Sequence, residues 1–221
     1  MNQTIENDRI ESIISDHYSI VVKEQYIQFG KNILELFTDK KCLSGVIHTL
    51  KYRVKSDTSL RDKIRRKYDR VHNGESLRDI ITDFVGVRVL VLFSHQLETI
   101  HNFINSNIGP NGVQLFEAPK AYTWDPEMKS FFERLGLICE AKDSLYTSLH
   151  YVVKPNTQST LTCEIQVRTL YEEIWGEIDH MINYPYLSTN THCVEQLKVL
   201  ARLTTTGSKL LDSIYKSHIN S

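Results

Sequence analysis

Apolar positions along the chain follow two periods, and the change from one to the other predicts a mixed α/β fold. From residue 9 to 37 apolar side chains recur every three or four positions, which indicates one or two amphipathic helices. Short β-branched or alternating runs predict strands at 46–54, 86–93, 112–118, 145–153 and 161–168. Helical spacing marks the other segments, at 58–70, 75–82, 95–106, 125–135, 169–183 and 192–217. We expect an α/β (α+β) protein with a mixed sheet of about five strands flanked by helices.

The two last helices carry their apolar residues at helical spacing. The residues concerned are Leu170, Ile174, Trp175 and Ile178 in the first, and Val194, Leu197, Leu200, Ala201, Leu203, Leu210, Leu211 and Ile214 in the second. We expect the chain to have three parts: an N-terminal helical segment (1–44), a core (45–185) and a C-terminal helical segment (186–221). The terminal helical segments are candidate surfaces for forming a homo-oligomer.

The strand at 161–168 has polar residues on one face. Glu164, Gln166 and Arg168 alternate with Cys163, Ile165 and Val167, so the two sets point to opposite sides. Because burying polar groups without partners is costly, the polar face is expected to line a cleft. A carboxylate beside a guanidinium in a cleft suggests a metal-bound polyphosphate.

Basic residues cluster around the start of the helix at 58–70. Seven of the fifteen residues from 53 to 67 are Lys or Arg. Arg53 and Lys55 alternate at a strand end, and Lys63 lies one helical turn beyond Ser59. Free N–H groups at a helix start favour anions, so this segment is a candidate phosphate site. The alternative is an ordinary solvated basic helix.

Two further segments add candidate chemistry. Asp83 lies just before the strand at 86–93, where it could be a Mg²⁺ ligand or a turn residue, and Gly86 would allow close backbone approach. Tyr146, Ser148 and His150 share one face of a predicted strand. A ring followed by hydrogen-bonding groups suits a nucleotide, although a half-exposed strand would look the same.

Together these four segments resemble the synthetase domain of the RelA/SpoT alarmone synthetases. The shared motifs are Arg-x-Lys-x-x-x-Ser-x-x-x-Lys, Asp-x-x-Gly-x-Arg, Tyr-x-Ser-x-His and Glu-x-Gln-x-Arg-Thr, in this order. The downstream Trp175, His180 and Tyr184 are similar to the tail of that domain. The resemblance covers roughly residues 45 to 215 and implies a nucleotidyltransferase-like fold.

The resemblance also implies an activity and a role for each motif residue. Such enzymes are pyrophosphokinases that move the β,γ-pyrophosphate of ATP to the 3′-hydroxyl of GDP or GTP and release AMP. Asp83 and Glu164 would hold Mg²⁺, and Glu164 would assist deprotonation of the hydroxyl. ATP would be bound by Arg53, Lys55, Ser59, Lys63 and Arg88. The acceptor would contact Tyr146, which stacks on the base, together with Ser148, His150, Gln166 and Arg168.

The loop before Tyr146 departs from the family pattern. Typical members have an Asn-Gly pair there, and this chain has Ser144 and Leu145. Asp143 and Ser144 are the candidates for reading the base, because Asp143 could accept hydrogen bonds from guanine N1–H and N2–H₂. We expect GDP or GTP as the acceptor, with an adenine nucleotide or the 3′ end of tRNA as the alternative.

Composition narrows the remaining possibilities. The net charge is −1, so the basic segment is a local patch on a neutral protein. Four scattered cysteines without a Cys-x-x-Cys pair fit a reducing cytoplasm. No run has the apolar length of a membrane helix. An inactive nucleotide or RNA sensor stays a possible alternative, but the presence of both Asp83 and Glu164 favours the enzyme.

Overall fold

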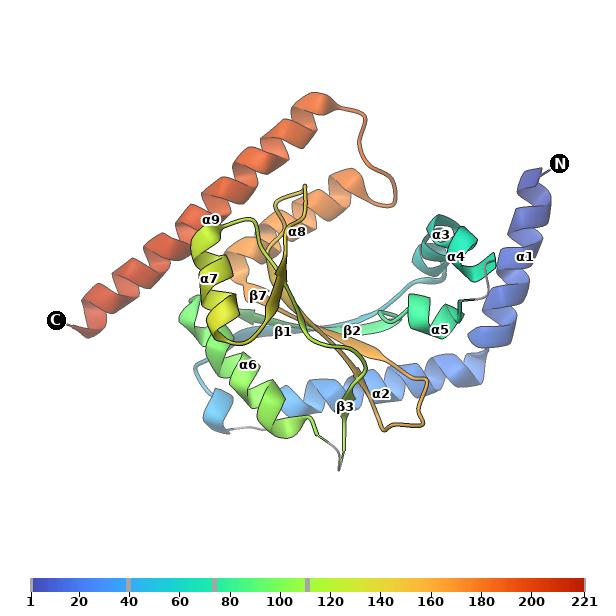
Figure 1. The fold of residues 1–221 in the computed structure, drawn as a ribbon, viewed down its shortest axis with the longest axis horizontal. Coiled ribbons are helices and arrows are strands. Elements are labelled where there is room, and N and C mark those ends of the chain that lie inside the picture. Colours follow the sequence, from blue (N-terminus) through green and yellow to red (C-terminus); the bar gives the residue numbers. More distant parts are fainter. Residues whose placement is uncertain (1, 39–40, 73–74, 110–111, 221) are drawn as a thin grey trace.

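The computed structural model describes residues 2–38, 41–72, 75–109 and 112–220, and it confirms the predicted mixed α/β class. Among these residues seven strands form one sheet in the order β1-β2-β7-β6-β4-β5, with β3 paired to β6 (Figure 1). β2 and β7 are parallel, whereas β1 and β6 run antiparallel to their neighbours β2 and β7. The strands are β1 (Ile47–Val54), β2 (Val85–Val91), β3 (Gln114–Leu115), β4 (Lys120–Tyr122), β5 (Ile138–Glu140), β6 (Ser148–Lys154) and β7 (Cys163–Thr169).

Helices flank the sheet along its length. They are α1 (Asn2–His17), α2 (Ile20–Thr38), the 3-10 helix η1 (Lys41–Leu43), α3 (Asp57–Arg66), α4 (Tyr68–His72), α5 (Leu77–Ile80), α6 (His95–Asn107), α7 (Pro126–Arg134), α8 (Leu170–Asn183) and α9 (Thr191–Ile219). The two ends of the chain lie on opposite sides of the molecule, with α9 extending past the sheet (Figure 1). The proposed boundaries at residues 44 and 185 stay a prediction.

Three local features differ from the sequence-based expectation. The helix predicted at 58–70 is interrupted at Lys67, which is the C-cap of α3, and continues as α4. The strand predicted at 112–118 is reduced to the two residues of β3. β4 and β5 have three residues each, which is too short for a period of two to be recognised in the sequence.

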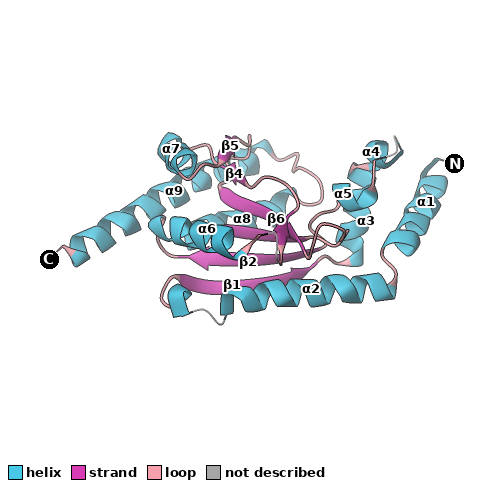
Figure 2. Ribbon diagram, turned by 60° about the horizontal axis from the view of Figure 1, so that its bottom comes forward, coloured by secondary structure: helices cyan, strands magenta, loops and turns pink. Residues whose placement is uncertain are grey.

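One face of the central strands is apolar and packs on helices. Val85, Val87 and Val89 of β2 are fully buried. α2 runs along this side of β1 and β2 (Figure 2), and it approaches closely at Gly30, where a Cβ atom would lie 2.8 Å from the Tyr52 ring. On the same face His101 of α6 hydrogen-bonds the buried Tyr151 hydroxyl over 2.7 Å.

The opposite face carries the polar residues and is partly covered by α8. The side of α8 that turns inward bears Glu172, Glu173 and Trp175, all buried, whereas Ile174 is 50% exposed. Thr169 starts this helix with a capping box, because its side chain and that of Glu172 each bond the other's backbone N–H group. Glu173 therefore faces the cations of the sheet, whereas Glu172 is bonded to Thr169 at the start of the helix. The apolar spacing in this helix did not indicate its inner side.

The cysteines and the helices also bear on the earlier expectations. Cys42, Cys139, Cys163 and Cys193 are all free thiols. In the part of the chain that the structure describes, no helix combines the length and the apolar character needed to cross a membrane.

Candidate active site

A continuous cleft lies on the polar face of β1, β2 and β7. A narrow part reaches Gly86 and Glu164, and a wide part of about 350 Å³ reaches Tyr146 and α8. Ligand pockets typically start near 300 Å³, so the wide part has room for a small molecule. The residues common to both parts are Arg53, Lys55, Asp83, Arg88 and Gln166.

The strand register sets the floor of the narrow part. Arg53 of β1 pairs with Gly86 of β2, and Gly86 pairs in turn with Glu164 of β7. All three positions face the cleft, and a side chain at Gly86 would stand between the guanidinium and the carboxylate. The glycine therefore keeps the floor open between these two groups.

Asp83 lies at the entrance of β2 between two lysines. Its carboxylate oxygens are 2.9 Å from Lys55 Nζ and 2.7 Å from Lys63 Nζ. Burial alone would raise the pKa of this carboxyl, but the charges of Lys63 and Lys55 outweigh burial and lower its pKa to about 2. Lys55 is itself buried, so the group is a preformed cluster of one anion and two cations.

Glu164 lies in the middle of a chain of hydrogen bonds that runs across β6 and β7. His150 Nδ1 is 3.0 Å from Glu164 Oε1, and His150 Nε2 is 2.9 Å from the Tyr146 hydroxyl. Burial opposes a charge on the imidazole, but Tyr146 and Glu164 outweigh it and raise the pKa of His150 to about 9. Burial also opposes a charge on Glu164 and by itself would raise the pKa of this carboxyl. The neighbouring His150 outweighs burial and brings the pKa of Glu164 below its usual value. At neutral pH the pair is therefore an imidazolium and a carboxylate.

Gln166 and Arg168 continue this chain toward α8. Gln166 donates to Glu164 Oε2 over 2.7 Å and accepts from Arg168 over 2.8 Å. Arg168 Nε lies 3.1 Å from Glu173 Oε2, and its guanidinium carbon sits 5.6 Å from the centre of the Tyr146 ring. Because each polar group has a neighbour of matching chemistry, the polar face can be buried at modest cost.

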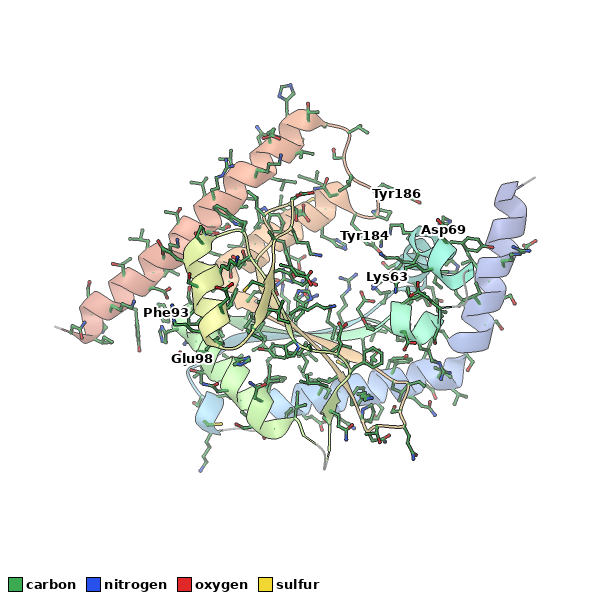
Figure 3. The ribbon with its side chains drawn as sticks, in the orientation of Figure 1. Lys63, Asp69, Phe93, Glu98, Tyr184 and Tyr186 are labelled. Carbon is green, nitrogen blue, oxygen red and sulfur yellow. The ribbon has the colours of Figure 1, made fainter. Side chains whose placement is uncertain are left out.

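Aromatic rings line the wide part of the cleft. The Tyr146 ring lies 5.9 Å from the Trp175 ring. Next to the cleft, the ring of Tyr122 meets His150 edge-on at 4.9 Å without lining either part. At the far side His180 stacks on Tyr184 at 4.4 Å. The Tyr184 hydroxyl donates to the carbonyl of Ser59 over 3.3 Å, and Figure 3 shows Tyr184 beside Lys63. The end of α8 thus contacts the start of α3 across the cleft.

The structure brings most of the predicted site residues into this cleft. They are Arg53, Lys55, Lys63, Asp83, Arg88, Tyr146, Glu164, Gln166 and Arg168, with His150 linking Glu164 to Tyr146. Tyr146 precedes β6 instead of lying in it, but its hydroxyl still meets His150. The predicted grouping therefore survives the shift in the start of the strand.

Four predicted residues lie elsewhere. The Ser59 hydroxyl accepts a hydrogen bond from the Ser56 hydroxyl, and the Ser148 hydroxyl is buried against the Val167 carbonyl. Asp143 and Ser144 line a neighbouring pocket of about 410 Å³ between their loop and the helices α8 and α9. This neighbouring pocket shares Asp179 and Asn183 with the cleft.

Two residues of the site were missed in the sequence. Glu173 is buried and contacts Lys51, Arg88 and Arg168. Glu172 and Glu173 are adjacent, and nothing in the sequence tells which of them faces the cleft cations. Tyr122 was missed because β4 is too short to predict.

Comparisons with known proteins show which family the chain resembles in sequence. A family described as "Region found in RelA / SpoT proteins" matches residues 52–189. The GTP pyrophosphokinase YjbM of Bacillus subtilis (strain 168) is 29% identical over 139 residues, which is 61% of this chain and 55% of YjbM. The GTP pyrophosphokinase YwaC of the same organism is 28% identical over 167 residues, 76% of this chain and 66% of YwaC. The matched regions thus span less than two thirds of both relatives.

The fold has solved counterparts as well. The crystal structure of small alarmone synthetase 1 from Bacillus subtilis superimposes with a TM-score of 0.62 at 21% identity, covering 97% of this chain and all of that one. A GTP pyrophosphokinase family protein from Streptococcus pneumoniae gives 0.64 at 21% identity over 87% of this chain and 90% of its own. The family match covers more than half of the chain, which therefore belongs to the RelA/SpoT family.

Proposed function

We propose that this protein is an ATP-dependent pyrophosphokinase that transfers the β,γ-pyrophosphate of ATP to the 3′-hydroxyl of GDP or GTP, giving (p)ppGpp and AMP. The observation that carries the proposal is the pair of ionised carboxylates, Asp83 and Glu164, in one cleft with Arg53, Lys55 and Arg88. An anion pair among cations suits a nucleotide that arrives with a divalent metal.

The curated relatives support the same activity. YjbM and YwaC are named GTP pyrophosphokinases. Small alarmone synthetase 1 of Bacillus subtilis has been crystallised with its product pppGpp and with AMPCPP. These ligands belong to that protein, and we carry their chemistry to this chain as nucleotide donor and acceptor.

The residues present fit Mg²⁺. Asp83 and Glu164 offer hard oxygen ligands, and both have pKa values lowered by neighbouring cations, so both are ionised. Among the described residues, no group of three His, Cys, Asp or Glu forms a complete protein cage. Mg²⁺ is commonly held by one or two carboxylates plus substrate phosphates, so Asp83 and Glu164 would hold it with the ATP phosphates. Bound there, the metal would neutralise charge on the transferred group.

The proposed reaction is a single displacement. The 3′-oxygen of the acceptor attacks the β-phosphorus of ATP, the bond from this phosphorus to the α,β-bridging oxygen breaks, and AMP leaves. Glu164 takes the proton of the 3′-hydroxyl, because the protonated His150 beside it cannot act as a base. Arg53, Lys55, Lys63 and Arg88 hold the donor in place, which is the main contribution of proteins to such transfers.

The acceptor is proposed to occupy the wide part of the cleft. Tyr146 offers a ring for the base, and Gln166 and Arg168 offer hydrogen bonds to the sugar and phosphates. Asp143 and Ser144 would read the base from the neighbouring pocket that joins the cleft at Asp179. Leu145 has φ +64°, a conformation that glycine adopts easily. The loop therefore follows a glycine-like path although the Asn-Gly pair is replaced.

The assay that tests this function is transfer of label from ATP. ATP labelled in the γ-phosphate is incubated with Mg²⁺ and, separately, with GDP, GTP, ADP, ATP and bulk tRNA, and the products are separated by chromatography. We expect labelled (p)ppGpp and one AMP per product. Label on an adenine nucleotide or on tRNA would instead identify a toxic small synthetase. Binding of nucleotides with no transfer to any acceptor would identify a sensor.

We also propose a homo-oligomer formed through the C-terminal helix. Val199, Leu203, Leu210 and Ile214 of α9 are 51–62% exposed and fall within an arc of roughly 60° at 100° per residue. The midpoint between Val199 and Ile214 along the sequence is also the midpoint between Leu203 and Leu210. A second copy of α9 packed antiparallel about this midpoint would therefore set Val199 on Ile214 and Leu203 on Leu210.

Light scattering after size exclusion tests this pairing. Leu203→Glu should convert the oligomer to a smaller species, while Lys198→Glu, on another side of α9, should not. A wild-type monomer at high concentration would reject the proposed pairing.

The free thiols fit the reducing cytoplasm in which we place the protein.

A further inference from the structure

Arg88 is held by two carboxylates of α8 that differ sharply in exposure. Its Nη1 is 3.1 Å from Glu173 Oε1 and also contacts Glu177 Oε1. The Glu173 side chain is 4% exposed, whereas that of Glu177 is 52% exposed. One carboxylate is therefore fixed inside the protein, and the other stands at its surface.

The two carboxylates differ in what it costs to break their pairs with Arg88. Removing the partner of a buried charge is strongly unfavourable, so Glu173 must keep its cations. A surface pair contributes little and competes with water, so Glu177 can leave Arg88 at small cost. Only the pair with Glu177 can respond to a ligand.

Lys51 offers Glu177 a second partner. Its Nζ is 2.6 Å from Glu173 and 3.9 Å from Glu177, and it lies opposite Arg88 in the β1–β2 register. Lys51 is half-exposed and is not among the residues that line the cleft. A small rotation of Glu177 toward Lys51 would exchange one ion pair for another and free one side of Arg88.

Arg88 lines both the narrow and the wide part of the cleft. Any anionic ligand that uses this guanidinium must share it with Glu177 or displace Glu177. The same negative carboxylate that pairs with Arg88 would also repel the phosphates of an approaching nucleotide. The arrangement thus sets a side chain of the protein in competition with the ligand.

We propose that Glu177 is a displaceable counter-ion that occupies Arg88 in the nucleotide-free protein and yields it to the donor nucleotide, moving to Lys51. The proposal rests on the proposed function, since that function makes ATP the ligand of Arg88. Glu177 does not touch the reacting atoms in this scheme, and it acts on donor affinity through Arg88. Removing its charge should therefore strengthen donor binding without changing the chemical step.

The test is calorimetric binding of a non-transferable ATP analogue with Mg²⁺ to Glu177→Gln. Because exposed ion pairs contribute about 0.2–1 kcal/mol, the Kd should fall about 1.4- to 5-fold. The KM for ATP should fall by a similar factor while kcat stays within twofold. Glu177→Ala, which cannot retain a hydrogen bond to Arg88, should move the Kd in the same direction.

Two matched variants separate this mechanism from a general effect of charge. Glu133→Gln removes an equally exposed carboxylate, 53% against 52%, that is paired with Lys129 on α7. Asp179→Asn removes a carboxylate that lines the cleft. Within the described residues, Asp179 forms no ion pair with Arg88, which is paired with Glu173 and Glu177. Both should leave the Kd of the analogue unchanged within error. If Asp179→Asn strengthens binding as much as Glu177→Gln, the effect is a field effect and the proposal is wrong.

The outcomes also distinguish this proposal from the function beneath it. Wild-type protein that transfers pyrophosphate while Glu177→Gln binds the analogue no better than wild type would overturn the counter-ion role alone. Wild-type protein that neither binds the analogue nor transfers label would overturn both proposals.

Discussion

The two halves of the cleft hold their polar groups in different ways. The proposed donor half, around Asp83, is built from ion pairs: two lysines neutralise one carboxylate before any ligand arrives. The proposed acceptor half, around Tyr146, is built from rings and hydrogen bonds, with His150, Trp175 and Arg168 about one side chain. Charge is concentrated in the first half and aromatic surface in the second.

This difference teaches what each half requires of its ligand. In the donor half, Asp83 is already paired with Lys55 and Lys63. A bound metal must compete with the lysines for the carboxylate, and the phosphates must compete with the carboxylate for the lysines. Binding there therefore depends on exchanging ion pairs. In the acceptor half a base can stack on the Tyr146 ring, which lines the cleft, while the bond between Tyr146 and His150 persists. Glu164 belongs to both halves, since it lines the narrow part and accepts from His150.

The largest expected effect comes from the two carboxylates. Asp83→Asn and Glu164→Gln should each lower kcat by about two to four orders of magnitude, because each removes a charge that positions the metal or accepts the proton. Label transfer measures the loss, and thermal unfolding checks that the fold persists. Near-normal turnover in either variant would reject the metal-site assignment.

A smaller effect should follow from removing the ring of the acceptor half. Stacking contributes about 1–3 kcal/mol per base, so Tyr146→Ala should raise the KM for the acceptor about 5- to 150-fold and leave the KM for ATP nearly unchanged. Tyr146→Phe keeps the ring and should retain most activity. Equal damage from both substitutions would show that the hydroxyl bond to His150, and not stacking, is the important feature.

The His150–Glu164 pair predicts a dependence of stability on pH. The pKa of His150 is raised from 6.5 to about 9, so the folded state holds this proton more tightly than the unfolded state does. The resulting stabilisation is complete below about pH 6.5 and is lost as the pH rises through about 9. Urea unfolding of wild type should show this decline, and His150→Gln should flatten it. An identical slope in the two proteins would contradict the assigned pair.

The smallest effect concerns the loop that enters the acceptor half. Leu145 at φ +64° carries a cost of about 1–2 kcal/mol that glycine avoids, while glycine gives more freedom to the unfolded chain. Leu145→Gly should therefore change the free energy of unfolding by less than about 1 kcal/mol, whereas Leu145→Val should destabilise by more than that. Chemical denaturation measures both. A large loss with glycine would show that the leucine side chain is needed for packing.

The sequence predicts the donor half better than the acceptor half for physical reasons. Asp83, Lys55 and Glu164 lie on or beside long strands whose alternation fixes their face, so their meeting in one cleft follows from the pattern. The acceptor half depends on Tyr122 from a three-residue strand and on a loop, neither of which has a period to recognise.

The helices were harder to orient than the strands. In α9 the buried side includes Leu197, Ala201, Thr204, Thr205 and Ser208, while Leu203 and Leu210 face outward. In α8 Glu173 turns inward because Lys51, Arg88 and Arg168 are there to pair with it. Tertiary partners thus decided the inner face where apolar spacing alone left two choices.

Separate binding of each nucleotide to one variant from each half tests the division of the cleft most directly. By calorimetry, Lys63→Ala should weaken binding of a non-transferable ATP analogue about tenfold, as expected for a charged contact of about 1.5 kcal/mol, and leave GTP unaffected. Tyr146→Ala should weaken GTP and spare the analogue, while Lys67→Ala, exposed beyond the end of α3, should spare both. If both nucleotides weaken in parallel in both variants, the cleft does not have separate donor and acceptor halves.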